Sequence, residues 1–331
     1  MSMGGLDPAI SLAENYRVWA LEATGRSPGY VTLSNAVADD LAILEFLGTL
    51  PPDKRQPNLL FAAACYLLGA PADPGTLREL IRRDPDRLAQ VMRIRRTQTN
   101  EPARCATLLP ALAQLPEPLA LIEVGASAGL TLLFDRYSYD YPGLRITGCD
   151  PEAPVLRCGL RGPVPVPARL PEITWRAGLD LNPLDVANDD DMRWLSCLVW
   201  PGEGDRAQRL TAAIAAARRS PPLVHRGDLL TDLPALAAQA PADATLVIYH
   251  SAVLAYVAPE DRERFAGIVR GLAAVWFSNE APGVVPGVPP SDRDDGTFVL
   301  ARDGRQALAR TDGHGDWVEW LPAPDGSRAN L

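Results

Sequence analysis

Lysine is almost absent from this 331-residue sequence, in which Lys54 is the only one and arginine supplies the other basic side chains. Basic residues number 32 against 41 acidic ones, so that the formal net charge is −9. Nucleic-acid surfaces depend on a basic face, and an acidic chain therefore argues against a nucleic-acid partner. A small molecule or a peptide is the expected substrate, and the sequence leaves the oligomeric state open.

Cysteine pairs and long apolar runs are also lacking. The five cysteines are far apart, odd in number and form no C-x-x-C pair, so neither a disulfide framework nor a zinc site is expected. The most apolar run, LLFAAACYLLG, is well short of the roughly 20 residues that span a bilayer, and the first residues lack the layout of a signal peptide. We expect a cytoplasmic protein with no metal site and no membrane contact.

The hydrophobic pattern changes near residue 117. Before it, apolar residues recur at helical spacing throughout. After it, short apolar runs alternate with longer helical stretches, which is typical of a mostly parallel sheet. The sequence therefore predicts two domains, an all-helical lobe over residues 1–116 and an α/β domain over residues 117–331.

Five apolar runs of the second domain are candidate parallel strands: residues 119–125, 144–150, 222–228, 244–250 and 273–279. Two further runs, TFVLARDG and GDWVEWL, frame a Gly-containing connection and are predicted to close the sheet as an antiparallel hairpin. Residues 151–221 are predicted to be an insertion, with a Pro-rich link, a possible strand around ITWRAG and a helix over GDRAQRLTAAIAAARR.

A Gly-Ala-Ser-Ala-Gly turn joins the first candidate strand to a helical pattern, and three functions are consistent with it. G-x-S-x-G between strand and helix is the elbow of a serine hydrolase, with Ser127 as nucleophile, and Asp228 and His250 follow in the order that a triad needs. A Gly-rich strand-to-helix turn can also bind the pyrophosphate of a dinucleotide. With Glu123 two places before Gly125, the turn resembles that of class I S-adenosylmethionine (SAM) dependent methyltransferases.

The surrounding sequence favours the third interpretation. A hydrolase elbow follows several strands and an upstream oxyanion segment, whereas the pattern before this turn's strand is helical. A dinucleotide turn would need glycine at Ser127 and Leu130. The methyltransferase pattern, acidic-x-G-x-G-x-G, is met by Glu123, Gly125 and Gly129, and Ser127 replaces its middle glycine. These four are the predicted cofactor-binding residues of the turn; the alternative is that Glu123 only caps backbone amides and Ser127 is an inert turn residue.

Three residues beyond the turn complete the predicted site. Asp150 ends the second candidate strand about 20 residues after the turn, where an acidic side chain can accept hydrogen bonds from both ribose hydroxyls. Asp228 ends the third strand, and the resemblance to class I methyltransferases implies that an acidic residue there holds the adenine amino group. His250 ends the fourth strand, at the edge where open α/β sheets bind ligands, and is the candidate general base. A structural role for His250 is the alternative.

Polar residues dominate the segment RIRRTQTNEPAR, which joins the helical lobe to the first strand. Because this segment is predicted to run beside the turn, we expect it to contact a polar or carboxylate-bearing substrate, toward which arginine offers a bidentate fork. A solvated linker is the alternative. The candidate substrate-binding residues are Arg96, Gln98, Asn100 and Glu101.

Taken as a whole, the chain resembles a family of uncharacterised bacterial proteins, the domain-of-unknown-function 2332 family. The resemblance rests on segments that occur in order, among them NLLFAAACYLL, RTQTNEPAR, EVGASAGLTLLFDRYSYDY, RAGLDLNPLDV, YHSAVLAY and HGDWVEWL. It implies a methyltransferase-like fold without an agreed substrate. Thr131 departs from the family pattern, in which asparagine is expected, and this puts a polar role of that position in doubt.

The predicted fold is a Rossmann-like class I methyltransferase sheet with a C-terminal antiparallel hairpin, preceded by the helical lobe. The predicted function is SAM-dependent methyl transfer to a small molecule or a peptide. The sequence lacks a clear N-P-P-Y or similar acceptor motif after the fourth strand, so an inactive methyltransferase fold that serves as a ligand sensor or scaffold is the main alternative. A serine hydrolase using Ser127 is less favoured.

Overall fold

The computed structural model describes residues 6–289 and 296–322. The chain divides into two compact units, one of residues 1–99 with 188–211 and the other of residues 100–187 with 212–331. This division differs from the predicted segments, because residues 100–116 belong with the sheet and part of the predicted insertion belongs with the helices.

The first unit is helical among its described residues, as the sequence predicts. Proline at the first turn begins four of its helices, where the missing N–H costs no hydrogen bond. A capping box of Asp73 and Thr76 begins one of them, and Gly69 at φ 79° ends another. The elements are α1 (Leu12–Glu22), α2 (Pro28–Ala38), α3 (Leu41–Gly48), η1 (Pro52–Lys54), α4 (Pro57–Leu68), α5 (Pro74–Arg83), α6 (Pro85–Ile94), α8 (Asp189–Cys197) and the start of α9 (Gly204–Arg219).

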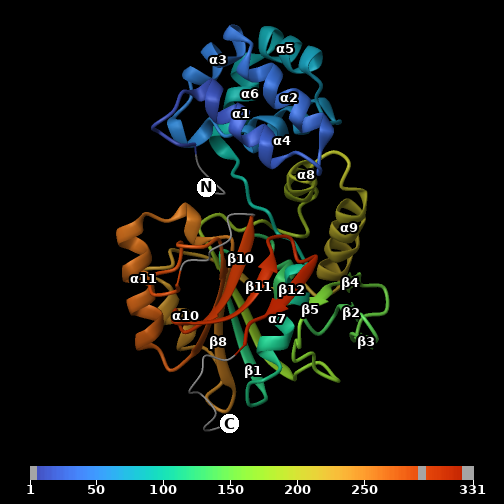
Figure 1. The fold of residues 1–331 in the computed structure, drawn as a ribbon, viewed down its shortest axis with the longest axis vertical. Helices are drawn as coiled ribbons and strands as arrows, with labels where there is room; N and C mark the ends of the chain where they lie inside the picture. Colours follow the sequence, from blue (N-terminus) through green and yellow to red (C-terminus); the bar gives the residue numbers. More distant parts are fainter. Residues whose placement is uncertain (1–5, 290–295, 323–331) are drawn as a thin grey trace. The chain divides into compact units, whose positions relative to one another are not determined.

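The second unit contains a nine-stranded sheet in the order β5-β12-β11-β10-β9-β8-β1-β6-β7 (Figure 1). Five neighbouring strands are parallel: β7 (Val224–Arg226), β6 (Ile173–Asp180), β1 (Leu119–Val124), β8 (Thr245–Ser251) and β9 (Val275–Glu280). Along the chain they are the third, second, first, fourth and fifth parallel strands, the order of a doubly wound sheet. The sheet continues with β10 (Thr297–Arg302), β11 (Gln306–Asp312), β12 (Trp317–Trp320) and β5 (Gly159–Arg161).

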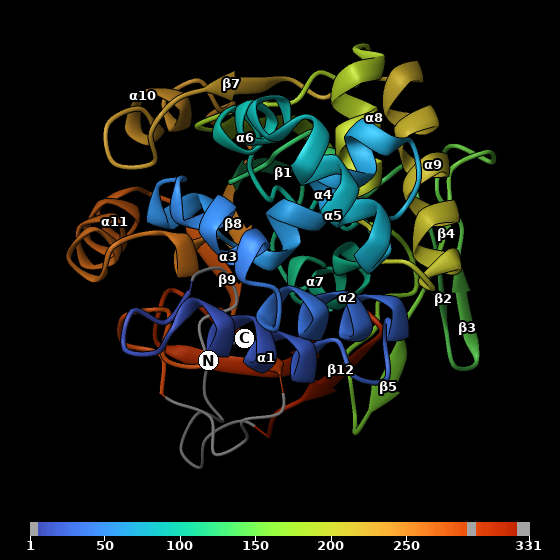
Figure 2. The same cartoon turned by 90° about the horizontal axis from the view of Figure 1, so that it is seen from above.

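C-terminal antiparallel strands are present as predicted, but the two predicted runs do not pair with one another. The strand β11, which was not predicted, lies between β10 and β12 and pairs antiparallel with both, and β10 also pairs antiparallel with β9. Helices cover both faces of the parallel part. Both views place α10 (Leu233–Ala237) and α11 (Pro259–Gly271) on one side of the sheet and α7 (Arg104–Leu112) on the other (Figures 1 and 2). The mixed α/β class with a mostly parallel central sheet is therefore as predicted.

The second candidate strand was predicted wrongly. Residues 144–146 form β3 (Leu144–Ile146) in a separate small sheet with β2 (Ser138–Tyr141) and β4 (Val155–Arg157). Leu144 and Arg145 are exposed, whereas a central parallel strand is buried on both faces. The neighbour of β1 on this side is instead β6, so the predicted strand near ITWRAG exists but belongs to the main sheet, between β1 and the edge strand β7, and not to an insertion. The helix predicted over GDRAQRLTAAIAAARR is confirmed as α9.

The helical pattern predicted after the glycine turn is also wrong. Only one 3₁₀ turn, η2 (Leu130–Leu132), follows Gly129 before the chain continues to β2. The reason is visible in the burial: every residue of 130–134 is buried, so this run has no polar face that an amphipathic surface helix would turn to water.

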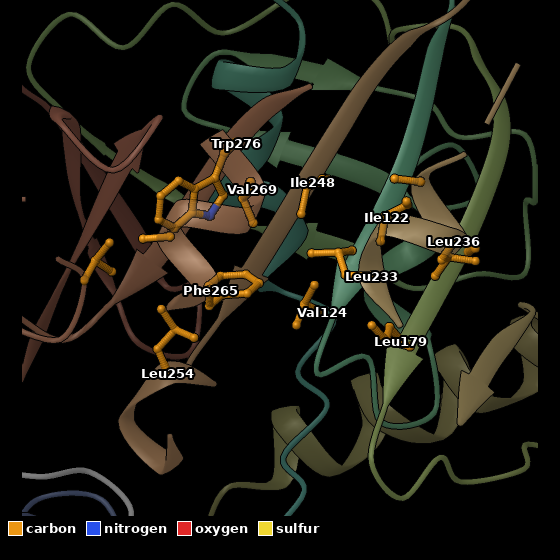
Figure 3. Close-up of a cluster of buried hydrophobic side chains, with 14 residues drawn as sticks. Ile122, Val124, Leu179, Leu233, Leu236, Ile248, Leu254, Phe265, Val269 and Trp276 are labelled. Carbon is orange, nitrogen blue, oxygen red and sulfur yellow. The ribbon is translucent and has the colours of Figure 1, made fainter. Parts of the chain in front are cut away.

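One face of the parallel strands packs against α10 and α11 to form a hydrophobic core (Figure 3). Ile122, Ile248 and Trp276 project from three adjacent strands, and Phe265 and Val269 of α11 pack against them. Burying each of these side chains contributes about 1.5–3 kcal/mol. This core fixes the strands whose carboxyl ends form the candidate site.

Candidate functional site

The turn after β1 is held in a left-handed backbone conformation at three positions. The φ angles are 73° at Gly125, 54° at Ser127 and 71° at Gly129. Backbone hydrogen bonds tie the turn to the neighbouring strand β6: Gly125 N–H donates to the carbonyl of Leu179 at 2.8 Å, and Ser127 N–H donates to Asp180 Oδ2 at 2.8 Å. A positive φ at a non-glycine residue costs of order 1–3 kcal/mol, and these contacts maintain it.

Both glycines of the turn face other parts of the protein. A Cβ atom on Gly125 would overlap both methyl groups of Val253, which follows β8. A Cβ atom on Gly129 would lie 2.7 Å from Cγ of Pro222 and 2.9 Å from Cγ2 of Val224. Packing within the protein therefore explains the absence of side chains at these two positions, which were predicted as cofactor contacts.

Glu123 is a buried carboxyl group at the carboxyl end of β1, with an exposed fraction of 5%. Its Oε1 accepts a hydrogen bond from the Thr131 hydroxyl, and its buried Oε2 has no hydrogen-bond partner among the described residues. Desolvation by burial raises the pKa of Glu123 to about 8, against the lowering effects of Thr131 and of the Arg104 charge. An isolated buried carboxyl of this kind is costly without a partner. Thr131, for which the sequence left a polar role in doubt, therefore donates a hydrogen bond to Oε1 of Glu123.

Further polar side chains are buried on the same face of the sheet. Asn100 Oδ1 accepts from Leu130 N–H at 2.8 Å, and Glu101 Oε1 accepts from Ala103 N–H at 3.1 Å. Arg104 Nη1 donates at 3.0 Å to the carbonyl of Ser251, which is the last residue of β8. Arg104 Nε donates at 2.9 Å to the carbonyl of Gly313. The start of α7 and its preceding segment thus lie against the carboxyl ends of β1 and β8.

The four predicted substrate residues are divided between the two units. Asn100 and Glu101 belong to the sheet unit and are buried near the turn. Arg96 and Gln98 belong to the helical unit, where the carbonyl of Arg96 accepts from Trp194 Nε1 at 3.0 Å and from the Gln98 backbone N–H at 3.0 Å. The structure therefore brings two of the four together.

Asp180 is a site residue that the sequence interpretation missed. It ends β6, the strand beside β1, and its two carboxylate oxygens accept from the backbone N–H groups of Ser127 and Asn182. The following side chain, Leu181, is 56% exposed. The only signal in the sequence was the aspartate in RAGLDLNP. Its position beside the turn could be recognised only with the knowledge that β6 pairs with β1.

Asp150 does not occupy the position predicted for it. It follows β3 of the small sheet and forms an ion pair with Arg219 of α9 at 2.6 Å. Since its strand is not the neighbour of β1, a ribose-binding role for Asp150 loses its geometric basis. Asp228 does follow β7, where its Oδ1 accepts from Leu230 N–H at 2.7 Å.

His250 is fully buried and both of its ring nitrogens are engaged. Trp276 Nε1 donates to His250 Nε2 at 3.0 Å, and His250 Nδ1 contacts Glu280 Oε1 at 2.7 Å. Because an indole N–H is only a donor, Nε2 is the acceptor and Nδ1 carries the proton that it donates to Glu280. Its side chain also lies on the opposite face of β8 from Tyr249, the register partner of Glu123. This arrangement leaves no nitrogen for a substrate proton, and the predicted general base is withdrawn.

The hydrolase interpretation gains no support from the geometry. Ser127 Oγ is buried without a hydrogen-bond partner among the described residues, so no histidine there is placed to activate it. His250 is paired with Glu280 rather than with Asp228. Within the described ranges, no cluster of three or more His, Cys, Asp or Glu residues could hold a metal ion, and no helix is long and apolar enough to cross a membrane.

Comparison with known proteins agrees with the resemblance in sequence. The sequence model of a family described as "Uncharacterized protein conserved in bacteria (DUF2332)" matches residues 13–320. The chain therefore belongs to this family. Neither a curated protein nor a solved structure matches it.

Proposed function

We propose that the sheet unit binds S-adenosylmethionine at the carboxyl ends of β1 and β6 and that the protein transfers its methyl group to a small molecule or a peptide. The observation that carries the proposal is Glu123, a buried carboxyl group with one unpartnered oxygen at the end of the first parallel strand. The strand order reverses between β1 and β8, which puts Glu123 at the switch point where doubly wound sheets bind ligands. A cationic amino group is the ligand group that best stabilises such a carboxylate.

The acidic residues of neighbouring strands suit the other parts of the cofactor. Asp180 ends the strand beside β1, and its carboxylate is the candidate acceptor for the ribose hydroxyls in place of Asp150. The exposed Leu181 offers an apolar surface to a flat adenine ring. Asp228, after the next strand, remains the candidate partner of the adenine amino group. The residues present thus fit a nucleoside with an amino-acid tail, although the glycines contribute packing and not open space.

The chemistry that the cofactor supplies when bound is an activated methyl group on a sulfonium. The residues of this chain would hold the donor and acceptor in line and exclude water, which is how alignment lowers a barrier. Glu123 would hold a proton in the free protein and release it to solvent when an incoming ammonium group binds beside its carboxylate. Because both ring nitrogens of His250 are hydrogen-bonded, to Trp276 and Glu280, the methyl acceptor must be a nucleophile that does not need His250 as a base.

A ligand sensor without turnover is the second candidate, and the engaged His250 is the observation that favours it. Both candidates require the same cofactor contacts but differ in methyl transfer. Incubation with SAM labelled in its methyl group and with extracts separates them, since label in an acceptor would exclude the pure sensor.

Calorimetry with S-adenosylhomocysteine tests the binding step that both candidates share. We expect binding by the intact chain, and a loss of affinity of about tenfold or more for Glu123→Gln and Asp180→Asn, since each removes a charge-assisted contact. Asp150→Asn is the matched control, because it changes the same chemical group in an ion pair with Arg219, and we expect its affinity to be unchanged. Binding of a dinucleotide without S-adenosylhomocysteine, or equal losses in Asp150→Asn and Asp180→Asn, would overturn the proposal.

A further inference from the structure

Two helices of the first unit, α4 and α8, lie side by side although they are far apart in sequence (Figures 1 and 2). Arg193 of α8 donates a hydrogen bond from its guanidinium to the carbonyl of Tyr66 in α4, and its Cζ lies 4.7 Å from the centre of the Tyr66 ring. The Tyr66 hydroxyl also donates to Asp190 of α8. These contacts hold the two helices in one fixed register.

This register brings together two of the five cysteines. The side chains of Cys65 in α4 and Cys197 at the end of α8 are close enough to affect each other's pKa, as expected for two helices in contact. Cys65 is partly exposed, whereas Cys197 is buried with an exposed fraction of 8%. A reagent in solution can therefore reach the first thiol, and the second lies within reach of the first.

The surroundings also favour the thiolate of Cys65. The neighbouring Cys197 side chain and the positive charge of Arg193 lower the pKa of Cys65, against the opposing effect of partial burial. The pKa of Cys197 is raised, because of its neighbour Cys65 and of burial. The thiolate is the nucleophile in thiol–disulfide exchange, so Cys65 is the attacking residue of the pair.

We propose that Cys65 and Cys197 form a reversible intramolecular disulfide that joins α4 to α8. The oxidant is a low-molecular-weight disulfide such as oxidised glutathione. Cys65 attacks one of its sulfurs, forms a mixed disulfide and releases the first glutathione thiolate. Cys197 then loses its proton to water and attacks the Cys65 sulfur, which releases the second glutathione thiolate. Two protein thiols are oxidised and one glutathione disulfide is reduced to two thiols.

The proposal goes beyond methyl transfer and does not depend on it. The disulfide would covalently fix residues 188–211, which leave the sheet unit after β6 and return to it, on the helices of residues 1–99. A bond that closes so long a stretch of chain constrains the unfolded state, so oxidation is expected to raise the midpoint of thermal unfolding.

The test uses the full chain with the substitution Cys149→Ser. This removes the exposed cysteine, so that four of the five thiols remain. After treatment with oxidised glutathione, we expect the number of free thiols titrated in denaturant to fall from four per chain to two. Reduction is expected to restore all four. Trypsin digestion would then give a cross-linked pair of peptides, residues 56–78 and 194–206. Adding Cys197→Ser is the matched control, in which Cys65 carries a glutathione adduct and no internal cross-link forms.

A second measurement does not depend on the disulfide. Arg193→Gln is expected to slow alkylation of Cys65 by iodoacetamide by at least threefold, because it removes the positive charge beside the thiolate. The proposal would be overturned if all four thiols stay free in oxidised glutathione or if Cys65 is cross-linked to a cysteine other than Cys197. It would also be overturned if Arg193→Gln leaves the alkylation rate of Cys65 unchanged.

Discussion

The indole Nε1–H of Trp276 donates to Nε2 of His250 at 3.0 Å, and this contact between β9 and β8 fixes the tautomer of the histidine. Glu280 Oε1 accepts from Nδ1 of the same ring and from the backbone N–H groups of Val253 and Leu254. The three side chains therefore hold the segment after β8. The methyl groups of Val253 in that segment fill the space beside Gly125, which couples the buried histidine to the glycine turn.

Replacing Trp276 by phenylalanine removes the donor to His250 and leaves Nε2 unsatisfied in the core. We expect a loss of about 1–3 kcal/mol of unfolding free energy, measured by chemical denaturation. Trp317→Phe is the control, because Trp317 is only partly buried and lies under the guanidinium of Arg161 from the edge strand β5, and we expect the substitution to cost less than about 1 kcal/mol. Equal effects of the two substitutions would show that the Trp276 N–H contributes nothing.

The elevated pKa of Glu123 predicts how stability changes with pH. The unfolded chain ionises this carboxyl near its ordinary value of 4.5 and the folded chain near 8, so the contribution of Glu123 is fully present below pH 4.5 and is lost as the pH rises to about 8. Over that window the loss is on the order of 4 kcal/mol. We expect Glu123→Gln to remove this slope, so that the variant gains on the parent as the pH rises. Unfolding midpoints from pH 5 to 8.5 check it, and parallel curves would contradict it.

The substitution Gly125→Ala tests the packing of the turn. It combines a left-handed backbone with overlap against Val253, and we expect a loss of about 2–4 kcal/mol. Gly143→Ala is matched in φ, at 79°, but its new methyl group would meet nothing within 4 Å, so only about 1–2 kcal/mol should be lost. In a double-mutant cycle, Val253→Ala should recover at least about 1 kcal/mol of the Gly125→Ala loss. If Gly125→Ala and Gly143→Ala cost the same, Val253 does not constrain the turn.

The sequence predicted those strands whose pattern is local. Residues 119–125, 244–250 and 273–279 are apolar runs bounded by turn signals, and they became β1, β8 and β9. Residues 144–150 read as the next strand only because they come next in the chain. The true neighbour of β1 begins at Ile173, and no local pattern marks a partner across so long a connection.

The candidate site also contains residues that a local sequence pattern reveals and residues that it does not. Glu123 stands out in sequence because an acidic residue within an apolar strand needs a partner. The Thr131 hydroxyl, Asp180 and the lock on His250 each depend on which strands are adjacent and which face a side chain takes. Such contacts cannot be read from spacing, and they changed the assignments of the acidic and basic residues.

Binding of S-adenosylhomocysteine is expected to release a proton through Glu123. At pH 7 the buried carboxyl of the free protein holds its proton, since its pKa is raised to about 8 by burial. An ammonium group at the unpartnered Oε2 would favour the carboxylate and bring the pKa below 7, so that close to one proton leaves per ligand bound. Calorimetry in phosphate and in Tris measures this directly, because the two buffers take up a proton with different enthalpies. Glu123→Gln should bind more weakly and show no buffer dependence.

A second ligand separates this effect from other protonation events. Methylthioadenosine has the nucleoside and thioether of the product but lacks the amino-acid part with its ammonium group, so it should bind through Asp180 and Leu181 without releasing a proton. Release with both ligands would assign the proton to another group. Release with neither, at unaltered affinity in Glu123→Gln, would mean that the ligand's amino group does not reach Oε2 and that the buried carboxyl serves only the fold.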